Sequence, residues 1–138
     1  MKVVLDTNVV VSALLFEGTV SRIHKLWKSG AIIPVANKAM IEEYTRVFSY
    51  RKFSLAEEEI AALLDEEIFP YFSVIRMSSK KIPHPPRDPG DISFLQAAME
   101  CGARYLVSGD PHLLVLNGKY PFSIVTPSNF LKNAGHAE

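Results

Sequence analysis

The sequence predicts an α/β fold in which helices cover both faces of a parallel β-sheet. Short apolar runs rich in β-branched residues recur along the chain, as in strands that are buried on both faces. Between these runs lie longer stretches with apolar residues at helical spacing. Such alternation favours a parallel sheet with crossover helices. Because no repeat, low-complexity tract or linker divides the chain, we expect a single domain over residues 1–138.

The expected strands are short. They cover residues 3–5, 31–35, 72–76, 104–107 and 122–125. The second contains Pro34, which cannot donate a ladder hydrogen bond, and this predicts a place at the end of a strand or the edge of the sheet.

The expected helices follow from caps and breakers around the periodic segments. They cover residues 8–16, 19 or 21 to 28, 38–50, 54–68, 89–101 and 112–116, and a last helix starts at Thr126-Pro127. Thr19 or Ser21 caps the second helix in this interpretation, and Gly30 ends it. Ser54 and Glu57 form a capping-box pattern. The one long loop, residues 78–88, is rich in proline.

Composition narrows the classes of function. Hydrophobic residues make up 48% and charged residues 22%, which is typical of a globular domain and excludes general disorder. Fifteen basic and fifteen acidic side chains cancel, so binding of RNA requires a local cluster of positive charge. The sole cysteine, Cys101, excludes an internal disulfide and is expected to be a small buried hydrophobe. With no signal peptide and no apolar run near the ~20 residues of a membrane span, we expect a cytoplasmic protein.

Two aspartates follow expected strands. Asp6 comes directly after the first strand, and Asp110 follows the fourth after Ser108 and Gly109, where glycine permits a tight turn. Ligand sites of open parallel sheets lie at these carboxyl ends. Either aspartate alone is also explained as a turn former or helix cap, but two at neighbouring strand ends indicate a site.

A helical wheel separates two adjacent glutamates. On the helix from residue 38, Glu42 lies opposite the apolar face, whereas Glu43 lies on its edge beside Met40 and Val47. Glu43 is therefore expected to lean towards the sheet. The alternative is a surface glutamate that pairs with Arg46.

Asp91 occupies the buried side of a later helix. Asp88 suits the N-cap and Pro89 the first helical position, so Asp91 is third and shares a face with Leu95 and Ala98. Asp91 as a reciprocal cap partner is the alternative. A carboxylate on an apolar face, however, needs a cation or several donors.

If Asp6, Glu43, Asp91 and Asp110 converge, they repel one another unless a cation neutralises them. All-oxygen ligands suit Mg²⁺ or Mn²⁺ rather than zinc. A divalent cation activates water for attack on a phosphodiester, so the pattern points to metal-dependent hydrolysis.

The segments that carry these residues resemble the PIN-domain family. They read Leu5-Asp6-Thr7-Asn8-Val9, Met40-Ile41-Glu42-Glu43-Tyr44-Thr45-Arg46-Val47-Phe48, Arg87-Asp88-Pro89-Gly90-Asp91-Ile92-Ser93-Phe94-Leu95 and Leu106-Val107-Ser108-Gly109-Asp110. Each motif alone is weak, but the four together fit the chain from Lys2 to about Leu131.

The resemblance implies a three-layer αβα sandwich and a Mg²⁺- or Mn²⁺-dependent ribonuclease. The catalytic and metal-binding roles that it implies fall on Asp6, Glu43, Asp91 and Asp110. It also implies that Asn8 and Ser108 support this acidic cluster. The single-domain form is similar to the toxin half of prokaryotic toxin–antitoxin pairs. This implies RNA as substrate, an antitoxin protein as partner and a homodimer.

One position departs from the family pattern. Many relatives carry an acidic or amide residue two positions after the last aspartate, where this chain has His112. His112 is a candidate RNA contact, as are four basic residues, Arg46, Arg51, Lys52 and Arg87, with Lys80 and Lys81 beside the proline-rich loop.

Two rival functions remain open. An inactive PIN-like module for RNA binding or protein assembly is favoured only by His112. A phosphotransferase with Asp6 as nucleophile, similar to haloacid-dehalogenase-like phosphatases, would want an aspartate where Asn8 stands.

Overall fold

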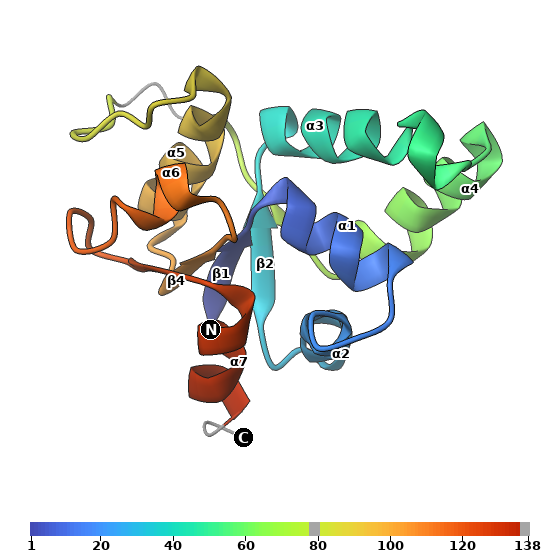
Figure 1. The fold of residues 1–138 in the computed structure, drawn as a ribbon, viewed down its shortest axis with the longest axis horizontal. Coiled ribbons are helices and arrows are strands. Elements are labelled where there is room, and N and C mark those ends of the chain that lie inside the picture. Colours follow the sequence, from blue (N-terminus) through green and yellow to red (C-terminus); the bar gives the residue numbers. More distant parts are fainter. Residues whose placement is uncertain (78–80, 136–138) are drawn as a thin grey trace.

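In the computed structural model, which describes residues 1–77 and 81–135, five parallel strands form a central sheet (Figure 1). The strands are β1 Lys2–Leu5, β2 Ile33–Ala36, β3 Ser73–Val74, β4 Tyr105–Val107 and β5 Ser123–Val125. Their order is β3-β2-β1-β4-β5, and every neighbouring pair is parallel. The α/β class with a parallel sheet is thus confirmed.

Helices join the strands and form the outer layers. They are α1 Thr7–Leu15, α2 Ser21–Ser29, α3 Lys38–Phe48, α4 Glu57–Ala62, α5 Ile92–Cys101, α6 Pro111–Leu114 and α7 Pro127–Gly135. Short 3₁₀ turns lie at Arg51–Phe53 (η1) and Pro89–Asp91 (η3), and a π-helical segment, Leu63–Ile68 (η2), follows α4.

The order of the strands places these helices in two layers. From β1 the chain moves outward to β2 and β3, and it then returns across the sheet to β4. Because parallel crossovers are right-handed, the outward and returning connections cover opposite faces. α5, on the returning connection, packs against β1, β2 and β4, whereas α1 packs against α2 and α3. The result is the expected three-layer αβα arrangement.

The central strand is fully enclosed. Val3, Val4 and Leu5 of β1 are completely buried, as a strand covered on both faces requires. The Tyr44 hydroxyl of α3 donates a hydrogen bond of 2.7 Å to the Leu5 carbonyl oxygen. Burial raises the pKa of the Tyr44 phenol well above its usual value, and the charges of Asp6 and Glu43 add to this effect. α3 is therefore fixed at the carboxyl end of β1.

Of the two places predicted for Pro34, the end of a strand is confirmed and the edge of the sheet is wrong, because β2 lies between β1 and β3. Pro34 is near the start of β2, where pairing with β3 begins only at Val35, and its missing N–H is tolerated there. The strand expected at residues 72–76 is reduced to Ser73–Val74 at the sheet edge.

The caps of two helices also differ from the prediction. α4 begins after Ala56, whose N–H donates to the Glu59 carboxylate at 2.9 Å, so the Ser54–Glu57 pattern is wrong by two residues. Ser54 instead closes η1 in a left-handed conformation, with φ of 52°. Because glutamates occupy positions 57–59 in succession, the sequence alone does not show which residue is the N-cap of α4.

Val20 precedes α2, and the Ser21 hydroxyl donates to the Gly18 carbonyl, so neither proposed residue caps this helix. Gly30 ends α2 with φ of 83°, as predicted. Thr126 caps α7, since its hydroxyl oxygen accepts from the Asn129 N–H at 3.2 Å.

Cys101 is half-buried rather than buried. No helix in the described ranges is long and apolar enough to cross a membrane.

Candidate active site

The carboxyl ends of β1 and β4 meet at the point where the order of the sheet reverses. From β1 the chain continues towards β2, and from β4 it continues towards β5 on the other side. This divergence opens a crevice above the two strand ends. A cleft of about 630 Å³ lies there, and its lining includes all four predicted carboxylates, Asp6, Glu43, Asp91 and Asp110.

Asp6 is buried at the floor of this cleft, with 6% of its surface exposed. The Ser108 hydroxyl donates a 2.5 Å hydrogen bond to Asp6 Oδ2, and its oxygen accepts from the Asp110 N–H at 2.9 Å. Burial raises the pKa of the Asp6 carboxyl. Hydrogen bonds from Ser108 and the Thr7 N–H oppose this rise, and the charges of Glu43 and Asp110 add to it. Ser108 thus links the Asp6 carboxylate to the backbone of Asp110.

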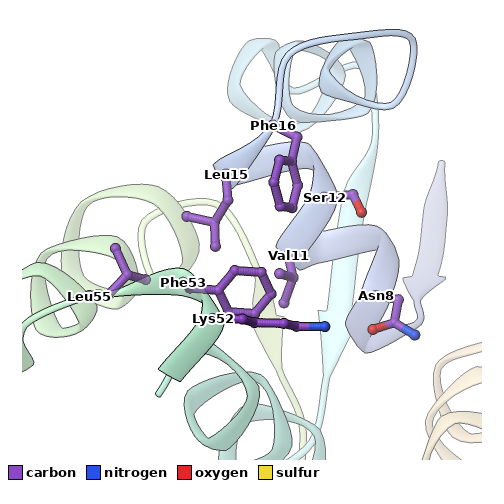
Figure 2. Close-up of a pocket in the computed structure, with 8 residues that line it drawn as sticks. All are labelled: Asn8, Val11, Ser12, Leu15, Phe16, Lys52, Phe53 and Leu55. Carbon is purple, nitrogen blue, oxygen red and sulfur yellow. The ribbon is translucent and has the colours of Figure 1, made fainter. Parts of the chain in front are cut away.

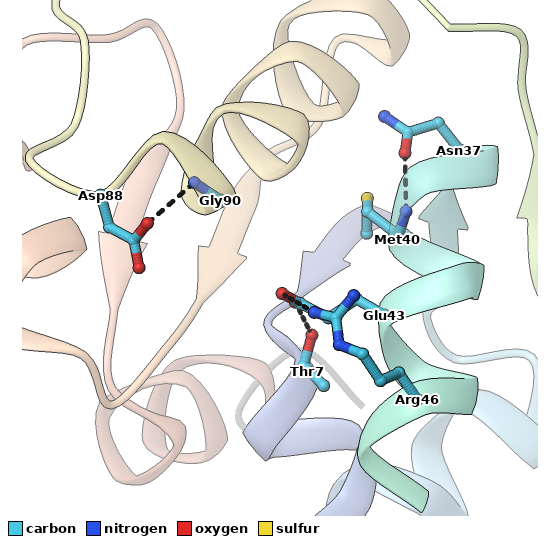
Figure 3. A network of polar contacts seen from close by, with 7 residues as sticks. All are labelled: Thr7, Asn37, Met40, Glu43, Arg46, Asp88 and Gly90. Carbon is cyan, nitrogen blue, oxygen red and sulfur yellow. Dashed lines mark hydrogen bonds and ion pairs between the residues drawn. The ribbon is translucent and has the colours of Figure 1, made fainter. Parts of the chain in front are cut away.

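Glu43 leans into the cleft from α3, as the helical wheel predicted. Its side chain is 26% exposed, against 64% for the adjacent Glu42. The Thr7 hydroxyl donates to Glu43 Oε2, and Arg46 Nη2 lies 3.4 Å from Oε1 (Figure 3). The pairing with Arg46 is therefore present as well, and it does not keep Glu43 out of the cleft.

The start of α3 is tied to α5 by its N-cap residue, Asn37, which the sequence also predicts as the cap of this helix. The side-chain oxygen of Asn37 accepts from the Met40 N–H at 3.0 Å, and its amide nitrogen donates to the Ser93 carbonyl at 3.0 Å. Because Glu43 and Asp91 lie on or next to these two helices, Asn37 helps to set their separation.

Asp91 is the least compensated carboxylate of the cleft. It is 8% exposed, and its Oδ2 is buried with no hydrogen-bond partner among the described residues. Burial raises the pKa of Asp91 to about 7, with further contributions from the charges of Asp110, Asp6 and Asp88 and from a hydrogen bond with Asp110. Asp88 is the cap, as predicted, and accepts from the Gly90 N–H at 2.9 Å (Figure 3). Asp91 itself makes no cap hydrogen bond within the described chain.

Asp110 combines two of the roles considered for it. Its Oδ1 accepts from the His112 N–H at 2.9 Å and so caps α6, while the side chain also lines the cleft. The tight-turn explanation for Gly109 is wrong, because its φ is not in the left-handed region and a Cβ there would meet no atom within 4 Å.

The candidate RNA contacts are placed unevenly. Lys52 lines the cleft, and Arg46 reaches its rim through Glu43. Arg51, Arg87 and His112 are exposed and lie outside the cleft lining. Lys81 is exposed beside the proline-rich loop, and Lys80 falls outside the described residues.

Thr7, Tyr50 and Phe53 also line the cleft, although the sequence interpretation gave them no role. For Thr7 a signal existed, because a hydroxyl next to a strand-end aspartate is well placed to orient a neighbouring carboxylate.

The residues present fit a hard divalent cation in their chemistry. The four candidate ligands are carboxylates, and two of them belong to aspartates with raised pKa values. Within the described part of the chain, Asp91 Oδ2 has no hydrogen-bond partner to compensate it. Within residues 1–77 and 81–135, however, no group of three or more His, Cys, Asp or Glu side chains is arranged so that it could hold a metal ion.

Comparison with known proteins agrees with this architecture. A model of the PIN domain matches residues 2–112. Among solved structures, the crystal structure of FitAcB from Neisseria gonorrhoeae superposes with a TM-score of 0.61, over 91% of this chain and 98% of that chain. At 13% identity, this similarity shows the fold alone. No curated protein matches the sequence.

Proposed function

Because the chain belongs to the PIN domain family, whose members are generally nucleases, we propose that it is a Mg²⁺- or Mn²⁺-dependent endoribonuclease. In this proposal residues 1–138 form one nuclease domain that hydrolyses RNA phosphodiester bonds. The observation that supports it most is the single cleft lined by Asp6, Glu43, Asp91 and Asp110 at the switch point of the sheet.

The four carboxylates would hold the cation, and their neighbours would orient them. A bound divalent cation lowers the pKa of a water molecule and neutralises charge on the leaving oxygen. Ser108 holds Asp6 and Thr7 holds Glu43, so two of the acidic groups are already directed by hydroxyl donors. Lys52 supplies a positive charge at the edge of the cleft, where it can position a phosphate.

We also propose that the protein is the toxin of a toxin–antitoxin pair, acts on RNA in the cytoplasm, and is a homodimer restrained by an antitoxin protein. The resemblance of its four motifs to toxin-like PIN domains supports this proposal. Light scattering of the purified protein tests the dimer. Rescue of growth by co-expression of the neighbouring gene product tests the restraint.

The direct test of function is cleavage of single-stranded RNA by the purified protein. Cleavage should require Mg²⁺ or Mn²⁺ and should stop with EDTA, since the four carboxylates that line the cleft offer oxygen ligands, which suit a hard cation. Full activity in chelator would contradict the metal mechanism. Binding of RNA without cleavage under any metal would favour the inactive binding module.

A matched pair of variants tests the site itself. Glu43→Gln should reduce cleavage about a hundredfold, or ~3 kcal/mol, because it removes a charge that faces the cleft. Glu42→Gln is the control, since Glu42 is mostly exposed and pairs with Lys38 at 3.8 Å. Rates of single-turnover cleavage give the comparison. Equal losses in the two variants would mean that the cleft is not the catalytic centre.

A further inference from the structure

A second cavity adjoins the carboxylate cleft. It has a volume of about 460 Å³ and lies between α1 and the segment around η1 (Figure 2). Asn8, Lys52 and Phe53 line both this cavity and the cleft, so the two lie side by side. We propose that this cavity is a subsite for one RNA nucleobase, next to the phosphate that is cleaved. The inference rests on the proposed ribonuclease function and deepens it.

Aromatic rings form one side of the cavity. Phe16 is 55% exposed, although a large apolar side chain is usually buried. Its ring centroid lies 6.0 Å from that of Phe53, with the planes at 60°, so the two rings make an edge-to-face pair. Val11, Leu15 and Leu55 complete the apolar lining. Exposed rings of this kind are the surfaces on which single-stranded bases stack.

Polar groups lie where the edge of a base and its phosphate would need them. Asn8 and Ser12 of α1 carry both donors and acceptors at the cavity (Figure 2). Lys52 Nζ is 5.2 Å from the centroid of the Phe53 ring, and Lys52 lines both hollows. An RNA chain with one base stacked on Phe16 and Phe53 would therefore have the neighbouring phosphate beside Lys52, on the way to the carboxylates.

Charge limits how far the strand can extend. Beyond Leu15 and Leu55 a third hollow, of about 250 Å³, is lined by Glu59, Glu66 and Glu67. Glu67 is paired with His24 at 2.7 Å and with Lys28 at 3.4 Å, so the charges of Glu59 and Glu66 are the ones expected to repel a phosphodiester. RNA is thus expected to place a single base in the cavity and to leave towards the cleft, where Lys52 stands. A protein partner would instead cover the cavity beside Phe16 and the third hollow beside it.

The test combines two variants with a modified substrate. Phe16→Leu and Phe53→Leu keep an apolar side chain but remove the stacking surface. Each should raise KM for a short single-stranded RNA about tenfold with little change in kcat. Phe69→Leu is the control, because Phe69 is similarly exposed, at 45%, and lies outside the cavity lining.

Substrates with one abasic nucleotide at each position in turn identify the base that is bound. In the wild-type protein one position next to the cut should show the same rise in KM, and the Phe16→Leu variant should show no further loss there. Unchanged KM in both variants, or an abasic penalty that persists in full in Phe16→Leu, would overturn the subsite and leave a protein partner as the occupant.

A different result separates the subsite from the proposed function. If the wild-type protein cleaves no RNA, the ribonuclease proposal fails, and the subsite is then judged by binding alone. Fluorescence anisotropy of a labelled uridine pentanucleotide with the full chain should still show weakened binding for Phe16→Leu but not for Phe69→Leu. Equal binding by these two variants and the wild type would overturn the subsite as well.

Discussion

Replacing Asp91 by asparagine should stabilise the metal-free protein while it removes a carboxylate from the cleft. Asp91 is buried, one of its oxygens has no partner in the described chain, and three other aspartates act on it. Its charged form is therefore disfavoured in the folded state. Asparagine has nearly the same shape and no charge, so the fold should lose the electrostatic penalty without leaving a hole.

The size and sign of the effect follow from the pKa. The Asp91 pKa is raised from 3.8 to about 7, so between these values the folded protein holds a proton that the unfolded chain has released. The free energy of unfolding therefore falls as pH rises through this window. About three pH units at 1.36 kcal/mol each give a penalty of about 4 kcal/mol, complete above pH 7 and absent below about pH 4.

Urea unfolding in EDTA at pH 4, 6 and 8 measures this penalty. Wild type and Asp91→Asn should be similar at pH 4, and the variant should gain up to about 4 kcal/mol at pH 8. Asp65→Asn, an exposed change outside the cleft, is the control and should leave the pH dependence as in wild type. If Asp91→Asn has the wild-type pH dependence, the Asp91 carboxyl is not the destabilising group.

Two further predictions concern Asp6 and its donor. Ser108→Ala should lower the free energy of unfolding by about 1–3 kcal/mol, because Asp6 Oδ2 and the Asp110 N–H both lose a buried partner; Ser123→Ala, on the exposed face of β5, serves as control in the same urea assay. Mg²⁺ at a hundred times its dissociation constant should stabilise the wild type by about 2.7 kcal/mol. In Asp6→Asn this shift should be lost, and an unchanged shift in thermal unfolding would mean that Asp6 does not bind the ion.

Local patterns in the sequence predicted the parts of the site that depend on one element. The helical wheel separated Glu43 from Glu42, and the Asp88-Pro89 cap placed Asp91 on the buried face, because the period of a helix fixes both relations. The contact between Thr7 and Glu43 joins residues 36 apart, and no periodicity links them. It depends on how α1 and α3 pack, which the sequence pattern does not specify.

The same reasoning explains which boundaries were wrong. Near α4, glutamates at three successive positions offered alternative cap partners, and in the structure Glu59 is the one that accepts from the N-cap. Pro34 lies near the start of a strand but not on an edge strand, because β3 pairs with β2 from Val35 onward. Whether a further strand pairs there cannot be read from Pro34 itself. Cap chemistry was a sound guide where one candidate stood alone, as at Gly30.

The cleft gathers acidic groups at a point where hydrogen bonds and buried side chains hold the neighbouring elements in place. The enclosed strand β1 and the link from Tyr44 to Leu5 fix the floor, and Asn37 fixes α3 against α5. These contacts involve neutral groups, so protonation of the aspartates does not disturb them. The repulsion among the carboxylates can therefore be relieved by a cation or by protons, since the scaffold leaves the acidic groups little freedom to move apart. For this reason a neutral residue at Asp91 should increase the stability of the metal-free protein and weaken its cleavage of RNA at the same time.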